Sequence, residues 1–283
     1  MNKNFVFTIT TGRSGQATLF NILKKASVDC VSAFEAPNFK PYFPWFLGDL
    51  EKILRRRFFE TNELLGRGKV LRAYEEKNYI YIENIAKKRL EIINRQMNKT
   101  NAESYFDVSK YYVRGLYKGF NNLLEKVSIV FLVRDPLENM KSFLNRNKNF
   151  FLDNSLPTKD SNILKMDNNS LSKGELYLWS WAETFLRFNK ISESANVKKK
   201  IIFKSEDLYS PKKVKSLLDF LEIKHSSINT IEKINTNEQE GFAKTEIDEN
   251  DLNILHEFIE KLSRDNIDLI SLLKSSLQRH KKN

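Results

Sequence analysis

The chain has 283 residues, of which 41% are hydrophobic and 29% are charged, a composition typical of a soluble globular protein. This length is sufficient for one large α/β domain with a buried core and is short for two. The longest apolar run, residues 127–133, is too short to cross a bilayer, and no secretory signal precedes the first apolar run. We therefore expect a single domain over residues 1–283 with no transmembrane segment.

The single cysteine, Cys30, excludes an internal disulfide and a cysteine-rich zinc site. Because no targeting segment is found either, the sequence predicts a reducing compartment, most simply the bacterial cytoplasm. The 47 basic residues outnumber the 36 acidic ones and give a formal net charge of +11, which favours an anionic partner such as a polyphosphorylated ligand, nucleic acid or a membrane surface. A solvated, lysine-rich surface explains the same charge equally well, since the basic residues are spread along the chain.

In chain order, short apolar runs typical of buried strands alternate with segments of helical periodicity. A strand at residues 5–9 is followed by a helix at 15–26 and a strand at 28–31. After a weaker strand candidate at 70–73, we expect a helix at 80–97, a strand at 105–108 and a helix at 114–124. A strand at 128–133, helices at 137–147 and 175–191, a strand at 201–203 and a helix at 211–221 complete the series. This alternation predicts an α/β fold of three layers, with a central parallel β-sheet flanked by helices.

Three segments depart from this alternation. Residues 34–47 contain three of the six prolines among several aromatic side chains, and this stretch either lines a ligand pocket or packs as a hydrophobic plug. Residues 150–173 are polar and aperiodic, so we interpret them as a surface loop or lid. Residues 228–283 are expected to be mostly helical and to pack over the ligand-binding side.

The first motif follows the first predicted strand. Residues 5–19 consist of a strand, a tight glycine-containing loop and the start of a helix, an arrangement that directs backbone N–H groups and the helix dipole at an oxyanion. Gly12 and Gly15 allow the backbone to approach a phosphate closely, Ser14 and Thr18 add hydroxyl groups, and Arg13 offers a planar guanidinium. The motif is not a Walker A loop, because Gly15 is followed by Gln16 where that loop has Lys and then Ser or Thr.

The second motif begins at the end of the strand predicted at 128–133. Arg134 follows that strand directly, at the edge of an open parallel sheet where ligands bind. Pro136 suits the first turn of the next helix, and Ser142 lies about two turns into it. Arg134 and Ser142 are therefore expected to face one pocket and to hold one phosphate from two sides. The alternative is an arginine paired with Asp135 beside an ordinary polar helix residue.

Together the two motifs resemble the superfamily of sulfotransferases that depend on 3′-phosphoadenosine 5′-phosphosulfate (PAPS), and they are closest to its bacterial and tyrosylprotein-type members. The first motif is similar to the family's 5′-phosphosulfate loop, usually Arg-Ser-Gly-Thr-Thr, with Gln16-Ala17 in place of Thr-Thr. The other motif is similar to its 3′-phosphate site, Arg-Asp-Pro followed by Ser. A third stretch, residues 201–209, resembles the family's late strand ending in Tyr-Glu-Asp-Leu, with Ser205 in place of Tyr. The resemblance implies the P-loop-like variant of the three-layer fold.

The resemblance also implies an activity. It is the transfer of a sulfuryl group from PAPS, a co-substrate, to a hydroxyl on a glycan, lipid, small molecule or tyrosine, with no metal. The loop would hold the 5′-phosphosulfate, Arg134 and Ser142 would hold the 3′-phosphate, and Glu35 would take the proton of the hydroxyl. Arg13 would stabilise the transition state, and Lys110 would approach the leaving phosphate unless it is an ordinary exposed lysine. The expected carrier-binding residues are Gly12, Arg13, Ser14, Gly15, Gln16, Ala17, Thr18, Arg134 and Ser142, and the expected catalytic residues are Glu35, Arg13 and Lys110.

Several alternatives stay open at this point. Asp107, at the end of another predicted strand, is a further candidate for the base. A nucleotide kinase would share the strand, loop and helix, but it should also carry the Gly-Lys-Ser/Thr signature and an acidic magnesium ligand. A relative that binds PAPS without turning it over is compatible with Gln16-Ala17. The sequence carries no recognised nucleic-acid-binding motif, so no nucleic-acid partner is expected. The acceptor and the oligomeric state are not readable from these residues.

Overall fold

The structure is a computed structural model, and it describes residues 3–35, 50, 61–146, 156–228 and 245–281. Most of the aromatic stretch at 34–47 lies outside the described residues, as do the first parts of the segments at 150–173 and 228–283.

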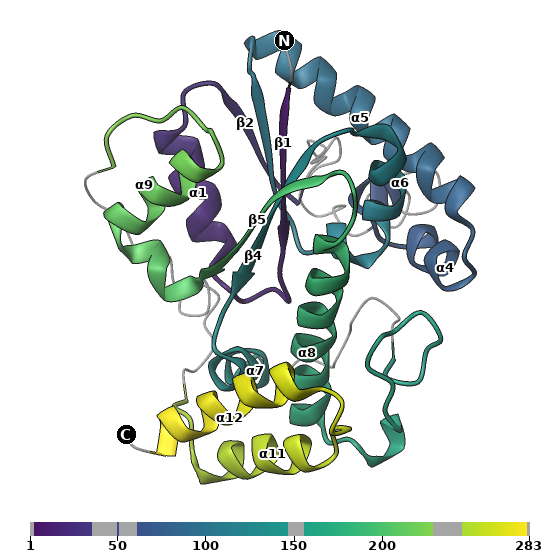
Figure 1. Ribbon diagram of the computed structural model, residues 1–283, viewed down its shortest axis with the longest axis vertical. Coiled ribbons are helices and arrows are strands. Elements are labelled where there is room, and N and C mark those ends of the chain that lie inside the picture. Colours follow the sequence, from purple (N-terminus) through teal and green to yellow (C-terminus); the bar gives the residue numbers. More distant parts are fainter. Residues whose placement is uncertain (1–2, 36–49, 51–60, 147–155, 229–244, 282–283) are drawn as a thin grey trace.

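Five strands form one sheet in the order β2-β3-β1-β4-β5, and every neighbouring pair is parallel. The predicted α/β fold with a central parallel sheet is therefore confirmed. All five carboxyl ends lie at one edge of the sheet, and β1 occupies its centre (Figure 1). The strands are β1 Asn4–Ile9, β2 Cys30–Phe34, β3 Ser104–Val108, β4 Val127–Val133 and β5 Val197–Lys204.

Helices cover both faces of this sheet. The α-helices are α1 Gln16–Ala26, α3 Thr61–Leu65, α4 Lys69–Glu75, α5 Tyr79–Thr100, α6 Leu116–Leu123, α7 Pro136–Leu144, α8 Lys173–Ser192, α9 Pro211–Phe220, α11 Glu249–Glu260 and α12 Ile267–Lys281. Short 3₁₀ turns are η2 Tyr112–Arg114, η3 Asn168–Ser170 and η4 Ser205–Tyr209. Helices α1 and α9 pack on one face and α5, α6 and α8 on the other, while α7, α11 and α12 lie beyond the carboxyl ends of the strands (Figure 1).

The alternation of side chains along β1 explains these two layers, since successive residues of a strand point to opposite faces. Phe5, Phe7 and Ile9 belong to the core beneath α5, α6 and α8. Val6 belongs to the second core, where it packs with Leu23 of α1. Both faces of the sheet are therefore buried along β1, β3 and β4, which is why these three strands read as nearly continuous apolar runs in the sequence.

Two sequence predictions need correction. The weak strand candidate at 70–73 is part of helix α4, which begins after Gly68 at a backbone φ of 59°. An apolar run of four residues does not distinguish a strand from one buried side of a short helix, and here Val70 is buried in the core that α4 shares with α5. The second strand begins at Cys30 instead of Val28, because Val28 is 65% exposed and its N–H donates to the carbonyl oxygen of Lys224 at 2.9 Å.

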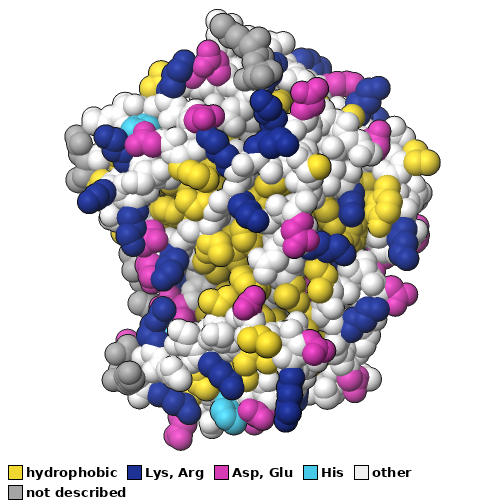
Figure 2. Space-filling view, viewed as in Figure 1, with side chains coloured by type: hydrophobic (Ala, Val, Ile, Leu, Met, Phe, Trp, Pro, Cys, Tyr) yellow, Lys and Arg dark blue, Asp and Glu magenta, His cyan; other side chains and the backbone are white. Residues whose placement is uncertain are grey.

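On the face drawn in Figure 2, Lys and Arg side chains are spread over the surface and alternate with Asp and Glu instead of forming one continuous basic patch. No helix within the described residues has both the length and the apolar composition needed to span a lipid bilayer.

Candidate functional site

The loop between β1 and α1 turns through three residues with positive φ, Gly12 at 89°, Arg13 at 56° and Gly15 at 86°. It delivers the chain to the start of α1 at Gln16, where the first N–H groups of a helix have no intrahelical partner. Within the described residues, the backbone N–H groups of Gln16, Ala17 and Thr18 donate to no protein acceptor. The loop therefore has the geometry of an anion-binding site.

Gln16 adds a side-chain donor to these backbone groups. Its side chain is 8% exposed, and its amide Nε2 has no hydrogen-bond partner within the described residues. A buried amide left without a partner costs free energy, so this donor is suited to a ligand oxygen. Gln16 occupies the position at which the family pattern has a threonine, and its amide can replace the missing hydroxyl as a donor.

Asn139 holds the loop in shape, and sequence analysis did not identify it. The residue lies on α7 and is 1% exposed. Its Nδ2 donates to the carbonyl oxygen of Gly12 at 2.9 Å and to Ser14 Oγ at 3.4 Å, while its Oδ1 accepts from Thr11 Oγ1 at 3.2 Å. Because these bonds engage one loop carbonyl and the Ser14 hydroxyl internally, the loop presents N–H groups outward. Ser14 Oγ itself donates to the carbonyl oxygen of Gly12 at 3.1 Å.

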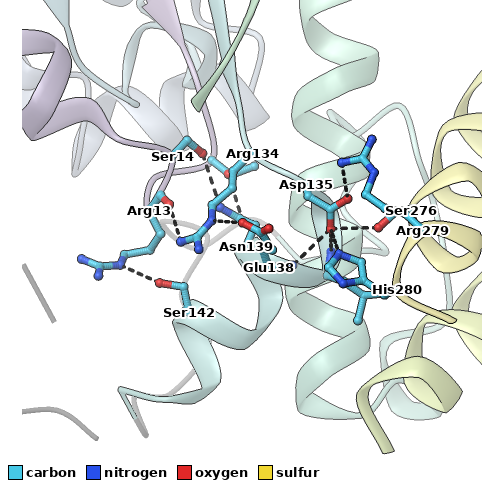
Figure 3. Close-up of polar contacts among 12 residues, drawn as sticks. Arg13, Ser14, Arg134, Asp135, Glu138, Asn139, Ser142, Ser276, Arg279 and His280 are labelled. Carbon is cyan, nitrogen blue, oxygen red and sulfur yellow. Dashed lines mark hydrogen bonds and ion pairs between the residues drawn. The ribbon is translucent and has the colours of Figure 1, made fainter. Parts of the chain in front are cut away.

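The structure brings Arg13, Arg134 and Ser142 together, as Figure 3 shows. Arg13 Nε donates to Ser142 Oγ at 3.2 Å, and Arg134 Nη1 lies 3.5 Å from the carbonyl oxygen of Arg13. The carbonyl of Arg134 accepts from Trp181 Nε1 at 2.9 Å, which fixes the backbone at the end of β4. Arg13 therefore contacts Ser142 through its guanidinium and Arg134 through its backbone carbonyl.

Arg134 is not paired with Asp135, so that alternative from the sequence is wrong. Its Nε instead donates to Glu138 Oε2, one turn later, at 2.9 Å. Asp135 caps α7 by accepting from the N–H groups of Leu137 and Glu138. Side chains of α12 also contact the Asp135 carboxylate.

Three side chains of α12 approach Asp135 (Figure 3). Ser276 Oγ donates to Asp135 Oδ1 at 2.8 Å, His280 Nε2 lies 3.3 Å from that oxygen, and Arg279 Nη1 lies 3.6 Å from Oδ2. These contacts attach the last described helix to the turn that carries Arg134.

Lys110 and Glu35 lie on the other side of the loop, at the ends of β3 and β2. A Cβ placed on Gly12 would lie 3.4 Å from Lys110 Cδ, and Lys110 Nζ is 3.9 Å from Glu35 Oε1. Burial, together with the charges of Arg114, Arg67 and Arg146, lowers the pKa of Lys110 to about 8, while Glu35 opposes this shift. The Lys110 side chain is 30% exposed and lies next to the loop. Glu35 is about one-third exposed at a φ of 47°.

Asp107, the other candidate for the base, is buried and forms an ion pair with Arg89. Burial raises the pKa of Asp107 to about 6, and the charge of Arg89 opposes the rise. Arg89 also donates to the carbonyl oxygen of Leu64 at 3.0 Å. This carboxylate is 1% exposed, so an acceptor hydroxyl cannot reach it, and Glu35 is the accessible carboxylate of the two. No cluster of three or more His, Cys, Asp or Glu residues suited to a metal ion occurs in the described ranges.

The β1–α1 loop also depends on the third sequence motif. A Cβ on Gly15 would lie 2.5 Å from Leu208 Cδ1, in η4, and the residue has a φ of 86°. We expect Gly15→Ala to lower the free energy of unfolding by about 2 kcal/mol or more, because the left-handed backbone and the overlap both cost energy. Gly12→Ala is the matched control, since Gly12 has a similar φ but meets no neighbour closer than 3.4 Å. Urea denaturation of both variants would show equal losses if the contact with Leu208 were unimportant.

No family model matches this sequence, and no curated protein matches it either. Two solved structures are similar in fold. The sulfotransferase domain from the Synechococcus PCC 7002 olefin synthase is 16% identical, with a TM-score of 0.46, and the match covers 97% of this chain and 94% of that one. The sulfotransferase domain from the curacin biosynthetic pathway is 10% identical, with a TM-score of 0.42, covering 90% and 97%. At these values the likeness concerns the path of the chain alone.

Proposed function

We infer that this protein transfers a sulfuryl group from PAPS to an acceptor hydroxyl. The observation that carries this proposal is the convergence of Arg13, Arg134 and Ser142 beside a loop that offers backbone N–H groups to an anion. PAPS has two anionic ends, a 5′-phosphosulfate and a 3′-phosphate. One loop and one separate arginine at the same sheet edge match that pair of charges.

On the donor side, the N–H groups at the start of α1 and the Gln16 amide would bind the 5′-phosphosulfate. Arg134 and Ser142 would bind the 3′-phosphate. Arg134 is paired with Glu138 at 2.9 Å on a partly exposed surface, where such a pair contributes little to stability. A dianionic phosphate can therefore replace Glu138 as the partner of this guanidinium at small cost.

The transfer of the sulfuryl group would take place at the 5′-phosphosulfate end of PAPS. Glu35 takes the proton of the acceptor hydroxyl, and the oxygen attacks sulfur as the bond between sulfur and the 5′-phosphate oxygen breaks. The products are the sulfated acceptor and 3′-phosphoadenosine 5′-phosphate. Negative charge would develop on the leaving phosphate, and Lys110 and Arg13 would offset it. Every atom of this step comes from the carrier, the acceptor and Glu35.

The test is calorimetric binding of 3′-phosphoadenosine 5′-phosphate, AMP and ATP to the wild type, to Arg134→Ala and to Arg264→Ala. We expect the 3′-phosphorylated ligand to bind about 10- to 150-fold more tightly than AMP, since a charge-assisted contact with phosphate is worth about 1.5–3 kcal/mol. Arg134→Ala should remove most of that difference. Arg264 is exposed between α11 and α12, so its replacement should leave the preference unchanged.

Two outcomes would contradict the proposal. Equal affinity for AMP and the 3′-phosphorylated ligand would leave no carrier site, and preferential binding of ATP would indicate a nucleotide kinase. Tight binding of the carrier without product formation from PAPS and any hydroxyl would instead identify a non-catalytic relative.

The low pKa of Lys110 leads to a pH prediction. A lysine is cationic below its pKa, so the charge that Lys110 offers to the leaving phosphate is present below about pH 8 and is lost above it. We expect kcat/KM for PAPS to fall tenfold per pH unit above that value. Lys110→Arg keeps its charge at high pH and should abolish this fall, whatever its rate at neutral pH. A pH profile unchanged by the substitution would exclude Lys110 as the titrating group.

A further inference from the structure

Asn139 on α7 lies against the β1–α1 loop (Figure 3), and it contacts the peptide group between Gly12 and Arg13. The carbonyl oxygen of Gly12 accepts from Asn139 Nδ2 at 2.9 Å. It also accepts from the hydroxyl groups of Thr11 and Ser14, each at 3.1 Å. Thr11 and Ser14 belong to the loop and move with it, whereas Asn139 belongs to a helix. Of these three donors, Asn139 is therefore the one that fixes the Gly12 carbonyl relative to the rest of the protein.

The direction of this carbonyl determines the direction of the next N–H group. In a planar trans peptide the C=O and N–H bonds point to opposite sides, so the hydrogen bond to Asn139 directs the N–H of Arg13 away from α7. If the peptide group rotated by half a turn, the Gly12 carbonyl oxygen would take the place of that N–H. An N–H group attracts an anion and a carbonyl oxygen repels it, so the two orientations differ in their capacity to bind one.

The observed orientation is not the one that the backbone of Arg13 favours by itself. Arg13 has a φ of 56°, and a left-handed backbone costs free energy for a residue that has a Cβ. Rotation of the peptide group would bring this φ to a negative value and relieve the cost. It would also take the Gly12 carbonyl from Asn139 Nδ2, and Asn139 is only 1% exposed. Because a buried amide that loses its partner costs free energy, Asn139 opposes the rotation.

The same helix contacts the proposed 3′-phosphate site. Asn139 and Ser142 are three residues apart on α7, a spacing that places two side chains next to each other on a helix. Ser142 Oγ accepts from Arg13 Nε at 3.2 Å. Helix α7 therefore holds the loop through Asn139 and carries Ser142 beside it.

We propose that Asn139 is a positioning residue, which keeps the N–H of Arg13 directed at the 5′-phosphosulfate by holding the Gly12 carbonyl on the opposite side. This inference rests on the proposed function and deepens it. Asn139 contacts neither the carrier nor the acceptor in this account. It acts through the orientation of one peptide group.

The experiment measures the contribution of each phosphate separately. Calorimetry gives the Kd of 3′-phosphoadenosine 5′-phosphate, of AMP and of adenosine 3′-phosphate. We define the 5′ ratio as the Kd of adenosine 3′-phosphate divided by that of the bisphosphate, and the 3′ ratio as the Kd of AMP divided by that of the bisphosphate. Asn139→Leu keeps the branched shape of the side chain and removes its hydrogen bonds. It should lower the 5′ ratio about tenfold or more, since a hydrogen bond to a charged group is lost, and should change the 3′ ratio by less than about threefold.

Asn196→Leu is the matched control. Asn196 is 8% exposed and its Nδ2 donates to the carbonyl oxygen of Leu124 at 3.2 Å. It is therefore also a buried asparagine bonded to a backbone carbonyl, but it lies before β5, at the edge of the sheet opposite the loop. Its replacement should lower stability and leave both ratios unchanged.

Arg13→Gly tests the peptide orientation itself. Glycine adopts a positive φ without the cost that Arg13 incurs, so the drive to rotate the peptide group is smaller. Asn139→Leu should therefore reduce the 5′ ratio by about threefold or less in the Arg13→Gly protein, compared with about tenfold or more in the wild-type background. An equal loss in both backgrounds would show that Asn139 does not act through this peptide group.

Thr11→Val provides a second, milder variant if Asn139→Leu does not fold. Thr11 Oγ1 donates to Asn139 Oδ1 at 3.2 Å and thereby fixes which end of the amide faces Gly12. Its replacement should lower the 5′ ratio about threefold, and an unchanged ratio would contradict the proposal.

The remaining outcomes separate this inference from the proposed function. A 5′ ratio unaffected by Asn139→Leu would overturn the positioning role, and so would an equal fall in both ratios, because the latter indicates a displaced α7. Failure of the proposed function appears in the wild type, as a protein that does not distinguish 3′-phosphoadenosine 5′-phosphate from AMP.

Discussion

Replacing Glu35 by glutamine should lower kcat by about 10²–10⁴-fold, the usual contribution of a general base. The amide has nearly the same shape as the carboxylate but cannot take up the hydroxyl proton. Glu35 has a positive φ of 47° at the end of β2, and glutamine retains the side-chain length, so the backbone cost is similar in both proteins. Formation of 3′-phosphoadenosine 5′-phosphate from PAPS, in the presence and absence of acceptor, measures the change.

Carrier affinity is the control for this substitution. Glu35 lies 3.9 Å from Lys110 and contacts no residue of the proposed 3′-phosphate site, so the Kd for 3′-phosphoadenosine 5′-phosphate should change by less than about threefold. A variant with an unchanged turnover rate would show that another group takes the proton. A variant with normal turnover but weak carrier binding would place Glu35 on the donor side.

Asp107→Asn should act on stability, with an expected loss of about 3–5 kcal/mol in the free energy of unfolding. The reason is that Arg89 is 2% exposed and would remain as a buried charge without its carboxylate partner. Replacing both residues, as Arg89→Met with Asp107→Leu, should recover much of the loss, because an apolar pair of similar volume leaves no charge unpaired. Urea denaturation of Arg89→Met, of Asp107→Leu and of the double variant gives the coupling free energy.

An exposed ion pair provides the comparison. Lys204 and Glu206 are both more than half exposed and lie 3.7 Å apart, so Glu206→Gln should change the free energy of unfolding by less than about 0.5 kcal/mol. If Asp107→Asn were equally mild, the carboxylate of Asp107 would be protonated or relaxed away from Arg89 in the native state. If it abolished turnover without loss of stability, Asp107 would have to be reconsidered as the base.

Much of the fold could be predicted from periodicity because both faces of the inner strands β1, β3 and β4 are buried. Runs such as residues 128–133 have few polar interruptions, and the intervening helices are long enough to show their apolar side. The run at 70–73 is too short for that criterion, and its helical state is determined by the glycine turn before it and by packing on α5. Local sequence does not contain that packing information.

Some residues of the candidate site can be identified from the sequence, and others only from the structure. Gly12, Gly15 and Arg134 stand in motifs whose spacing along the chain reflects their geometry, so the sequence identifies them. Asn139 has no such signal, since a buried asparagine in a helix resembles any polar helix residue until its partners in the β1–α1 loop are known. The choice between Glu35 and Asp107 depends on burial, because both lie close to the end of a predicted strand and only the structure shows that Asp107 pairs with Arg89.

The attachment of α12 to Asp135 has a consequence for the order in which the chain assembles during synthesis. Residues 135 and 276 are separated by 141 positions, so the turn that carries Arg134 leaves the ribosome long before Ser276 and His280 do. Contacts between positions so distant in sequence form late, because they close long loops of the chain. A nascent chain can therefore complete its sheet while the end of β4 still lacks its final support. Capacity to bind the carrier should accordingly mature after the core, at the last stage of folding.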